Sequence, residues 1–336
     1  MTQRRIGVDL GRTAVRVAEV DGAPGKPLRL LRFGEQALPP GCVERAEVID
    51  PRRVSAAVRR ACKAAGVRSR DAVLGVAGEH AIVRPLTLPA ASREQMRASL
   101  PFLVQESLPV PVGDCVLDFF PIHGDGHQVE GLLVAVPDAA TTAAVEAVEQ
   151  AGLRVVGVDL AAFALVRAVV GPGGPHAVTA VVDVGADGMQ IVVAEHGVPQ
   201  LVRFGAGAGA ALVDELARLL GLDPGSAEQA LHDERAVHGD LAPLIAAHAE
   251  RMAATVAETL AFHAQSGNRP VQAVLLTGRG AGLPGFGQYL ATFARVPVSL
   301  PRADGVFVVD GKAARACDAA LPAWAVAAGL AVGGAA

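Results

Sequence analysis

The chain has 336 residues, of which 51% are hydrophobic and 19% charged, and its formal net charge at pH 7 is −4. This length allows about two domains, and so apolar a chain can bury a large core, which excludes an intrinsically disordered protein. Basic residues number 30 against 34 acidic ones and are dispersed along the chain, which argues against a protein that binds nucleic acid.

In the first half, hydrophobic alternation and turn residues predict strands and helices in alternation. A helix from Pro51 has proline in its first turn and glycine at its end. Ser92 and Gln95 have capping-box spacing, and their helix is expected to reach about Ser107 with an interruption near Pro101. The other expected elements are three strands within 4–36, strands at 72–77, 81–88, 115–122, 128–137 and 155–158, and helices at 139–151 and 160–170.

The second half begins after a Gly-Pro-Gly-Gly-Pro linker at 171–175. Strands are expected at 179–184, 189–195, 198–204 and 271–277, and helices at 209–221, 226–232, 241–266 and 284–293. The last stretch, 319–336, is mostly Ala and Gly and contains Pro322, so we expect a helix that closes the core. It has neither the length of unbroken apolar sequence of a membrane span nor the basic face of an interfacial helix.

Cysteine and histidine spacing predicts no metal centre. Four widely separated cysteines are expected to be free thiols in a reducing cytoplasm: Cys42, Cys62, Cys115 and Cys317. The N-terminus leads directly into a strand and lacks the apolar core of a signal peptide. His123 and His127 are expected in a solvated hairpin turn, and His248 and His263 lie on the long helix without zinc-enzyme spacing.

Two segments repeat one pattern: an apolar strand, an aspartate, one residue, a glycine and a second strand. The first copy runs from Ile6 to Glu19 and the second from Val181 to Glu195, and both continue to Arg-Phe-Gly, at 32–34 and 203–205. Self-similarity at a separation too long for a solenoid repeat suggests two duplicated domains. Paired across a cleft, two such hairpins could hold a polyphosphate and its metal.

The residue types in these hairpins suit phosphate and magnesium. A tight turn of glycine and small residues lets backbone N–H groups approach phosphate oxygens. The candidates for such contacts are Gly11, Arg12 and Thr13 in the first turn, and Gly185, Ala186 and Asp187 in the second. Asp9 and Asp183 could hold Mg²⁺ or its waters, because Mg²⁺ takes few direct protein ligands. Arg16, just past the first turn, could lie over the phosphates.

A third motif, at 274–285, is a buried strand, a glycine turn and a helix start. Gly278 and Gly280 would let a flat base lie against the backbone, while Arg279 could stack on it. The chain has no Walker sequence and no Gly-x-Gly-x-x-Gly after its first strand, which disfavours P-loop and dinucleotide folds.

These three motifs, in this order, resemble the actin-like ATPase superfamily over nearly the whole chain. Between them, residues 83–89, 105–112, 116–119 and 149–159 resemble the PilM family of type IV pilus assembly proteins, which is similar to FtsA in carrying an inserted subdomain. The resemblance implies an α/β fold of the actin-like (ribonuclease H-like) kind, with two duplicated domains and a small inserted α+β subdomain of the SHS2 type.

The resemblance also implies a domain organisation. The first core domain would comprise 1–81 and, as closing helix and linker, 155–175, with the partner-binding insert at 82–154. The second domain would comprise 176–336, with a helical subdomain at about 206–268 and a C-terminal helix that returns to the core.

The function implied by the resemblance is that of a cytoplasmic adaptor that binds ATP and Mg²⁺. It would bind the cytoplasmic N-terminal tail of PilN, an inner-membrane protein, between the insert and the first core subdomain. It would therefore lie at the inner face of the cytoplasmic membrane through its partner, without inserting itself, and self-association stays open. The resemblance also places Gly207 and Glu228 at the nucleotide.

This chain departs from the family pattern at several nucleotide-site positions. Gly188 and Met189 stand where a hydroxyl residue is usual, and Arg16 replaces a lysine. Leu231 and His232 follow the Ala-Glu pair of the later helix where a lysine is expected, and Arg279 lies among the glycines. These departures predict slow or absent ATP hydrolysis.

Three alternative functions remain open from the sequence. One is an FtsA-like, membrane-associated actin homologue that forms filaments. Another is a scaffold that keeps the fold without nucleotide. The third, which we expect less, is a small-molecule kinase with Asp187 or Asp240 as the general base.

Overall fold

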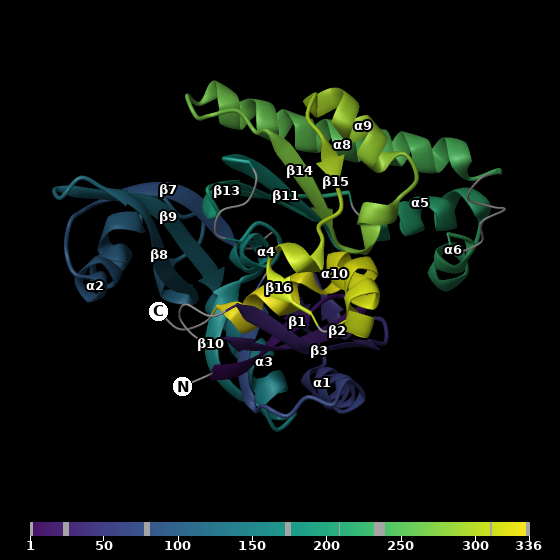
Figure 1. Cartoon of the computed structure of the whole chain (residues 1–336), viewed down its shortest axis with the longest axis horizontal. Coiled ribbons are helices and arrows are strands. Elements are labelled where there is room, and N and C mark those ends of the chain that lie inside the picture. Colours follow the sequence, from purple (N-terminus) through teal and green to yellow (C-terminus); the bar gives the residue numbers. More distant parts are fainter. Residues whose placement is uncertain are drawn as a thin grey trace.

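The chain forms two large β-sheets with helices between them and on their outer faces, and two smaller sheets beside them (Figure 1). The computed structural model describes residues 3–22, 27–76, 81–171, 176–207, 209–231, 239–309 and 311–333, without the side chains of residue 3 and of 311–320. Most of the linker at 171–175 and His232 lie outside the described residues.

The first sheet has six strands in the order β10-β6-β1-β2-β3-β16. β1, β2 and β3 run antiparallel, whereas β6 and β10 run parallel to β1. A strand from late in the chain, β16, pairs parallel to β3 at the edge. The bounds are β1 Gln3–Leu10, β2 Ala14–Gly22, β3 Leu28–Ala37, β6 Asp71–Val76, β10 Arg154–Leu160 and β16 Phe307–Val308.

The second sheet repeats this arrangement in the order β13-β12-β11-β14-β15. β11, β12 and β13 are antiparallel, and β14 and β15 run parallel to β11. The strands are β11 Val178–Val184, β12 Met189–Glu195, β13 Val198–Gly205, β14 Ala273–Thr277 and β15 Val298–Ser299. The strand order matches β3-β2-β1-β6-β10, so the described topology agrees with a duplicated domain.

Two helices, α4 (Ala161–Val169) and α10 (Gly311–Val332), lie between the sheets (Figure 1). Strand alternation explains these layers, because one face of the first sheet packs on α4 and α10 and the other on α1 (Pro51–Ala65) and α3 (Asp138–Glu149). The outer face of the second sheet packs on α8 (Ala242–Gln265) and α9 (Phe286–Ala294).

Glycines allow α10 to touch its neighbours through backbone atoms. A Cβ atom on Gly7 would lie 1.8 Å from the Ala327 carbonyl oxygen, and one on Gly329 would lie 1.8 Å from that of Ala164. The helix begins eight residues before the expected start at 319 and is kinked at Trp324, which follows Pro322. Proline removes a helical hydrogen bond, which explains the kink.

The insert has a small core of its own. Its sheet, in the order β7-β9-β8, packs on α2 through residues such as Leu88, Leu100 and Phe119. The bounds are β7 Ile82–Pro89, α2 Arg93–Val104, η1 Val112–Asp114, β8 Cys115–Gly124 and β9 Gln128–Pro137. The following helix, α3, packs instead with α1 under the first sheet. The segment with its own core therefore ends at β9, short of the expected boundary at 154.

The capping box of α2 is confirmed. The Gln95 N–H donates to Ser92 Oγ at 3.2 Å, and the Ser92 N–H donates to Gln95 Oε1 at 3.1 Å. The expectation of an interruption near Pro101 is wrong, because α2 runs through that residue and ends at Val104. Sequence reasoning also missed four two-residue strands, which are too short for periodicity to detect: β4 Val43–Glu44, β5 Glu47–Val48, β15 and β16.

Beside the second sheet, α5 (Gly209–Leu220), α6 (Pro224–Ala230) and the start of α8 share a small core that includes Leu212, Leu216 and Ile245. Two further short helical turns are η2 (Arg279–Gly282) and η3 (Ala303–Gly305). Within the described ranges, no helix is both long enough and apolar enough to cross a membrane.

Candidate functional site

The two Asp-x-Gly hairpins have the same backbone arrangement. Asp9 pairs with Arg16 across β1 and β2, and Asp183 pairs with Gln190 across β11 and β12. The Gly11 N–H donates to the Ala14 carbonyl at 3.1 Å, and in the second turn the Gly185 N–H donates to the carbonyl three residues later at 3.0 Å. Each aspartate therefore occupies the same place in its lobe.

The two aspartates differ in their partners. Asp9 Oδ2 lies 3.6 Å from Nη1 of Arg16, whereas Asp183 Oδ1 accepts a hydrogen bond of 2.9 Å from Thr277 Oγ1. Burial raises the pKa of Asp9, and it raises the pKa of Asp183 to about 6, with the charge of Asp9 as a further cause. The charge of Asp9 acts on Asp183, and Arg12 of the first hairpin turn pairs with Asp187 of the second, so the two aspartates lie near the junction of the lobes, which we call the cleft.

This cleft has the chemistry of a divalent-cation site with few protein ligands. A cation would compensate two carboxylates whose ionised forms are disfavoured by burial. The described residues include no group of three or more His, Cys, Asp or Glu side chains placed to hold a metal. Two carboxylates could hold a cation such as Mg²⁺, which retains several waters and takes few direct protein ligands.

Arginines connect the two lobes at this cleft. Arg12 Nη1 in the first hairpin turn donates to Asp187 Oδ1 in the second at 2.8 Å. Arg16 Nε donates to Glu35 Oε2 at 2.8 Å, and Arg279 from the other lobe donates to Oε1 of the same carboxylate. These contacts bring the two hairpin tips together and join the third motif to the first lobe.

The glycines of the third motif pack against the second hairpin. Gly278 has φ +82°, and a Cβ atom there would lie 2.3 Å from the Val184 carbonyl oxygen. A Cβ atom on Gly280 would lie 2.3 Å from Val184 Cγ1. These glycines are therefore required by close packing, and their contact with a base stays a prediction. The side chain of Arg279 is 61% exposed, so it is accessible for stacking.

The start of α5 joins the second turn. The N–H groups of Gly209 and Ala210 donate to the carbonyls of Gly185 and Ala186 at 3.2 and 2.8 Å. Gly207, just before this helix, has φ +86° and open space around it.

Glu228 is exposed on α6, and no hydrogen bond or ion pair within the described ranges joins it to the other candidates. Thr13 is exposed in the first turn, and its carbonyl accepts the Leu38 N–H at 2.8 Å. These two predicted positions are therefore not drawn into the cleft by direct contacts of their side chains.

The histidines and cysteines form no site within the described part of the chain. His123 and His127 are exposed at the β8–β9 turn, while His248 and His263 are buried in α8. Cys42, Cys62 and Cys115 are free thiols, and the side chain of Cys317 lies outside the described residues. Burial raises the pKa of Cys62 to about 11, which makes this thiol a poor nucleophile.

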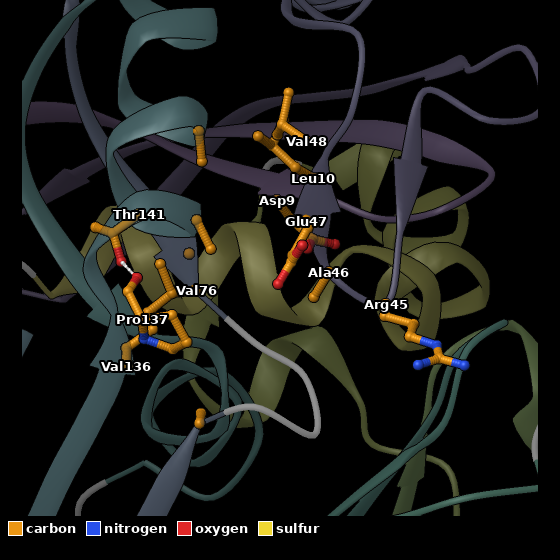
Figure 2. Close-up of a pocket in the computed structure, with 14 residues that line it drawn as sticks. Asp9, Leu10, Arg45, Ala46, Glu47, Val48, Val76, Val136, Pro137 and Thr141 are labelled. Carbon is orange, nitrogen blue, oxygen red and sulfur yellow. Dashed lines mark hydrogen bonds between the residues drawn. The ribbon is translucent and has the colours of Figure 1, made fainter. Parts of the chain in front are cut away.

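A pocket of about 30 Å³ adjoins Asp9 on the side of the insert. Its walls come from the end of β1, the β4–β5 hairpin, β6 and the junction of β9 with α3. Figure 2 shows Asp9 and Glu47 on one side of it and Pro137 and Thr141 on the other. The tip of the β4–β5 hairpin, Arg45 and Ala46, has two successive positive φ angles of 49° and 64°, which is unusual for residues other than glycine.

Three residues of the cleft were missed by sequence reasoning: Glu35, Thr277 and Gln190. Glu35 directly follows the first Arg-Phe-Gly repeat, and Thr277 ends the strand before the glycine turn. The place of each residue in its motif could therefore have identified it as a candidate. Gln190 occupies the place of Arg16 in the second hairpin, and its buried Oε1 has no hydrogen-bond partner. Aligning the two repeats residue by residue would have found it.

A family model described as "Type IV pilus assembly protein PilM" matches residues 7–334. Among solved structures, the PilM–PilN type IV pilus biogenesis complex contains a chain similar over 98% of this chain and 97% of that one, with 24% identity and a TM-score of 0.87. The ethanolamine utilization protein EutJ from Carboxydothermus hydrogenoformans matches over 98% and 89% of the two chains, with 18% identity and a TM-score of 0.58.

A diol dehydratase-reactivating factor in its nucleotide-free form also matches, over 98% of this chain and 99% of that one, with 10% identity and a TM-score of 0.59. At these identities the solved structures establish the fold. The actin-like fold expected from the sequence is confirmed.

Proposed function

The chain belongs to the PilM family of type IV pilus assembly proteins, and from this premise we propose that it is an ATP-binding adaptor of pilus or related secretion machinery. The observation that carries the nucleotide part is the pair of matched hairpins whose aspartates, Asp9 and Asp183, share one cleft. A protein of this kind responds to nucleotide and partner and does not turn over a metabolite.

The residues present fit ATP with Mg²⁺. Asp9 and Asp183 would hold the cation, which on binding neutralises phosphate charge. The turn amides of the hairpins, together with Arg12 and Arg16, would hold the phosphates. Arg279, whose planar face could stack on the base, would also present N–H groups to them. The unpartnered Oε1 of Gln190 offers a further polar atom beside Asp183.

We also propose that hydrolysis is slow or absent. A general base for the attacking water needs a free carboxylate near the phosphates. Asp187 is held by Arg12 at 2.8 Å, and Asp240 is exposed in the turn before α8. Gly188 and Met189 supply no hydroxyl at the second turn.

The proposed partner is the cytoplasmic N-terminal tail of an inner-membrane PilN-like protein. The similar solved chain comes from a PilM–PilN complex. In this chain the pocket of about 30 Å³ between the insert and the first core would admit the tip of a small apolar side chain of such a tail, because Val48, Val76 and Ala144 form part of its lining. The protein would thereby reach the inner face of the cytoplasmic membrane.

Calorimetric titration with Mg-ATP tests the nucleotide part. We expect binding by the wild type and its loss in an Asp9→Ala, Asp183→Ala double variant, because both cation ligands are removed. An exposed acidic residue on α2, Glu94, supplies the control Glu94→Gln. Absence of binding at millimolar Mg-ATP would contradict ATP binding and favour the nucleotide-free scaffold.

A synthetic peptide from a PilN-like tail tests the partner part. Ala140 lines the pocket, whereas the adjacent Ala139 is exposed and does not. We expect Ala140→Phe to weaken peptide binding roughly tenfold, because it fills the pocket, and Ala139→Phe to leave binding unchanged. Equal binding by both variants would move the partner site elsewhere.

A further inference from the structure

Each of the three arginines in the cleft already has a carboxylate partner. Glu35 uses one oxygen for Arg16 of its own lobe and the other for Arg279 of the opposite lobe. Arg12 pairs with Asp187 at 2.8 Å, again across the lobes. The groups that would bind phosphate are therefore engaged by the protein itself.

The position of Glu35 follows from strand register. Glu35 on β3 pairs with Arg16 on β2, which pairs with Asp9 on β1. The three side chains therefore share one face of the first sheet, at the end where the hairpin turns. A phosphate bound by the same N–H groups of Arg16 and Arg279 would occupy the place of the Glu35 carboxylate.

A carboxylate resembles a phosphate group in its recognition by arginine. Both present anionic oxygens to the N–H groups of a guanidinium. In the cleft, four carboxylates face three arginines, so an incoming polyphosphate meets a surplus of negative charge. The carboxylates are Asp9, Glu35, Asp183 and Asp187.

We propose that Glu35 is an internal competitor for the phosphate site, which occupies Arg16 and Arg279 and joins the lobes when nucleotide is absent. The inference rests on the proposed nucleotide function and adds that Glu35 lowers the affinity for nucleotide. Phosphate binding would displace Glu35 from both arginines, and the displaced carboxylate, still near the phosphates, would repel them.

The exchange at Arg279 is energetically feasible because the Glu35–Arg279 pair is partly solvated. The side chains of Glu35 and Arg279 are 30% and 61% exposed. Ion pairs of this exposure contribute little net stability, so a polyphosphate with its cation can replace them. Arg16 is only 12% exposed and stays within the cleft, available to the incoming anion.

The test compares Glu35→Gln with the matched control Glu149→Gln at an exposed site on α3, which removes the same charge outside the cleft. Thermal unfolding is followed with and without Mg-ATP, and affinity is measured by calorimetry. Without ligand, we expect Glu35→Gln to unfold at a lower temperature, because the lobes lose their shared carboxylate. We expect Glu35→Gln to bind Mg-ATP roughly tenfold tighter than the wild type does. Mg-ATP should therefore raise the unfolding temperature of Glu35→Gln more than that of the wild type.

A lower unfolding temperature without ligand, together with a higher affinity for Mg-ATP, would indicate competition. A merely structural role of Glu35 would lower both the unfolding temperature and the affinity. If the wild type binds Mg-ATP and Glu35→Gln binds equally or more weakly, the inference is overturned while the proposed function stands. If neither protein binds Mg-ATP, both fall. Should Glu35→Gln not fold, Glu35→Asp replaces it, because the shorter side chain withdraws the carboxylate from Arg16 and Arg279. An affinity no higher than that of the wild type would then overturn the inference.

Discussion

The two hairpins share a backbone but differ in the chemistry of equivalent side chains. Asp9 faces the cationic Arg16, whereas Asp183 faces the neutral Gln190 and accepts a hydrogen bond from Thr277. The duplicated strands thus fix where each group lies, and the two lobes have acquired different roles. The first aspartate lies beside a cation, while the direct partner of the second is the Thr277 hydroxyl.

The same contrast extends into the core. Glu19 lies three residues beyond Arg16 on β2, and Val193 lies three residues beyond Gln190 on β12. Both side chains are fully buried, but the carboxylate accepts N–H bonds from Arg68 and Ser69 at 3.0 and 2.7 Å. The first lobe therefore uses a buried charge to anchor a loop where the second uses apolar packing.

The largest effect on stability is expected when Glu19 of the first lobe is replaced by valine, the residue at the equivalent position of the second lobe. Glu19→Val should destabilise the protein by about 3 kcal/mol at pH 7, because it leaves two backbone N–H groups and Arg32 without their acceptor. Urea unfolding measures the loss, and Glu19→Gln, which keeps one acceptor oxygen, should lose less. A Glu19→Val protein as stable as the wild type would mean that the two hairpins are interchangeable here.

The effect of Glu19 should depend on pH. Burial alone would raise the pKa of Glu19, but hydrogen bonds from Ser69, Arg32 and Arg68 outweigh it and lower the pKa below 4.5. Its stabilisation is therefore present above pH 4.5 and lost as pH falls through the lowered value. The difference in free energy of unfolding between the wild type and Glu19→Val should therefore become smaller at acidic pH.

The next largest effect is expected at Asp183, where substitution should stabilise the protein. The pKa of Asp183 is raised from 3.8 to about 6, so the folded state loses stability as pH rises from about 4 to about 6, and the full loss persists above pH 6. Asp183→Asn should therefore stabilise the protein by about 2 kcal/mol at pH 8, and this gain should vanish near pH 4, where the aspartate is protonated in the folded state and increasingly so when unfolded.

The comparison variant is Asp9→Asn, measured in the same unfolding series. Asp9→Asn should gain less stability, because it also removes the carboxylate charge that lies 3.6 Å from Arg16. Equal gains at pH 8 would show that the two aspartates have the same electrostatic environment. Both variants should weaken Mg²⁺ binding.

The smallest effect is expected for the bridge between the hairpin tips. In a double-mutant cycle with Arg12→Ala and Asp187→Ala, the coupling should be below about 1 kcal/mol, because the side chains are 42% and 26% exposed. Added salt should reduce it further. The pair Arg97–Asp118 in the insert, at 45% and 44% exposure, provides a control that does not cross the cleft. A coupling above about 2 kcal/mol would show that the tips are locked together.

The sequence predicted the fold well because its main signals are local. Hairpin strands, the Pro51 start of α1 and the capping box of α2 follow from periodicity and end residues. The actin-like assignment rested on the order of three motifs and on resemblance. Short strands such as β16 form only through tertiary pairing, so no local signal announces them.

The candidate site was predictable only in part. Aspartates and glycines stand at fixed offsets in a repeat, whereas the role of Glu35 depends on an arginine 244 positions away. The close approach of Gly278 to Val184 likewise depends on how two strands pack. Such pairings arise from tertiary geometry, which residue types and spacing do not encode directly.

The placement of α10 has a consequence for biosynthesis. This helix packs on the first sheet through Gly7, and Arg5 donates to the Gly333 carbonyl at 3.0 Å. The strands made first therefore expose one apolar face until residues more than 300 positions later have been made. A nascent chain therefore cannot complete the core of its first lobe until that helix has been made, and the uncovered apolar face is open to misassembly during synthesis.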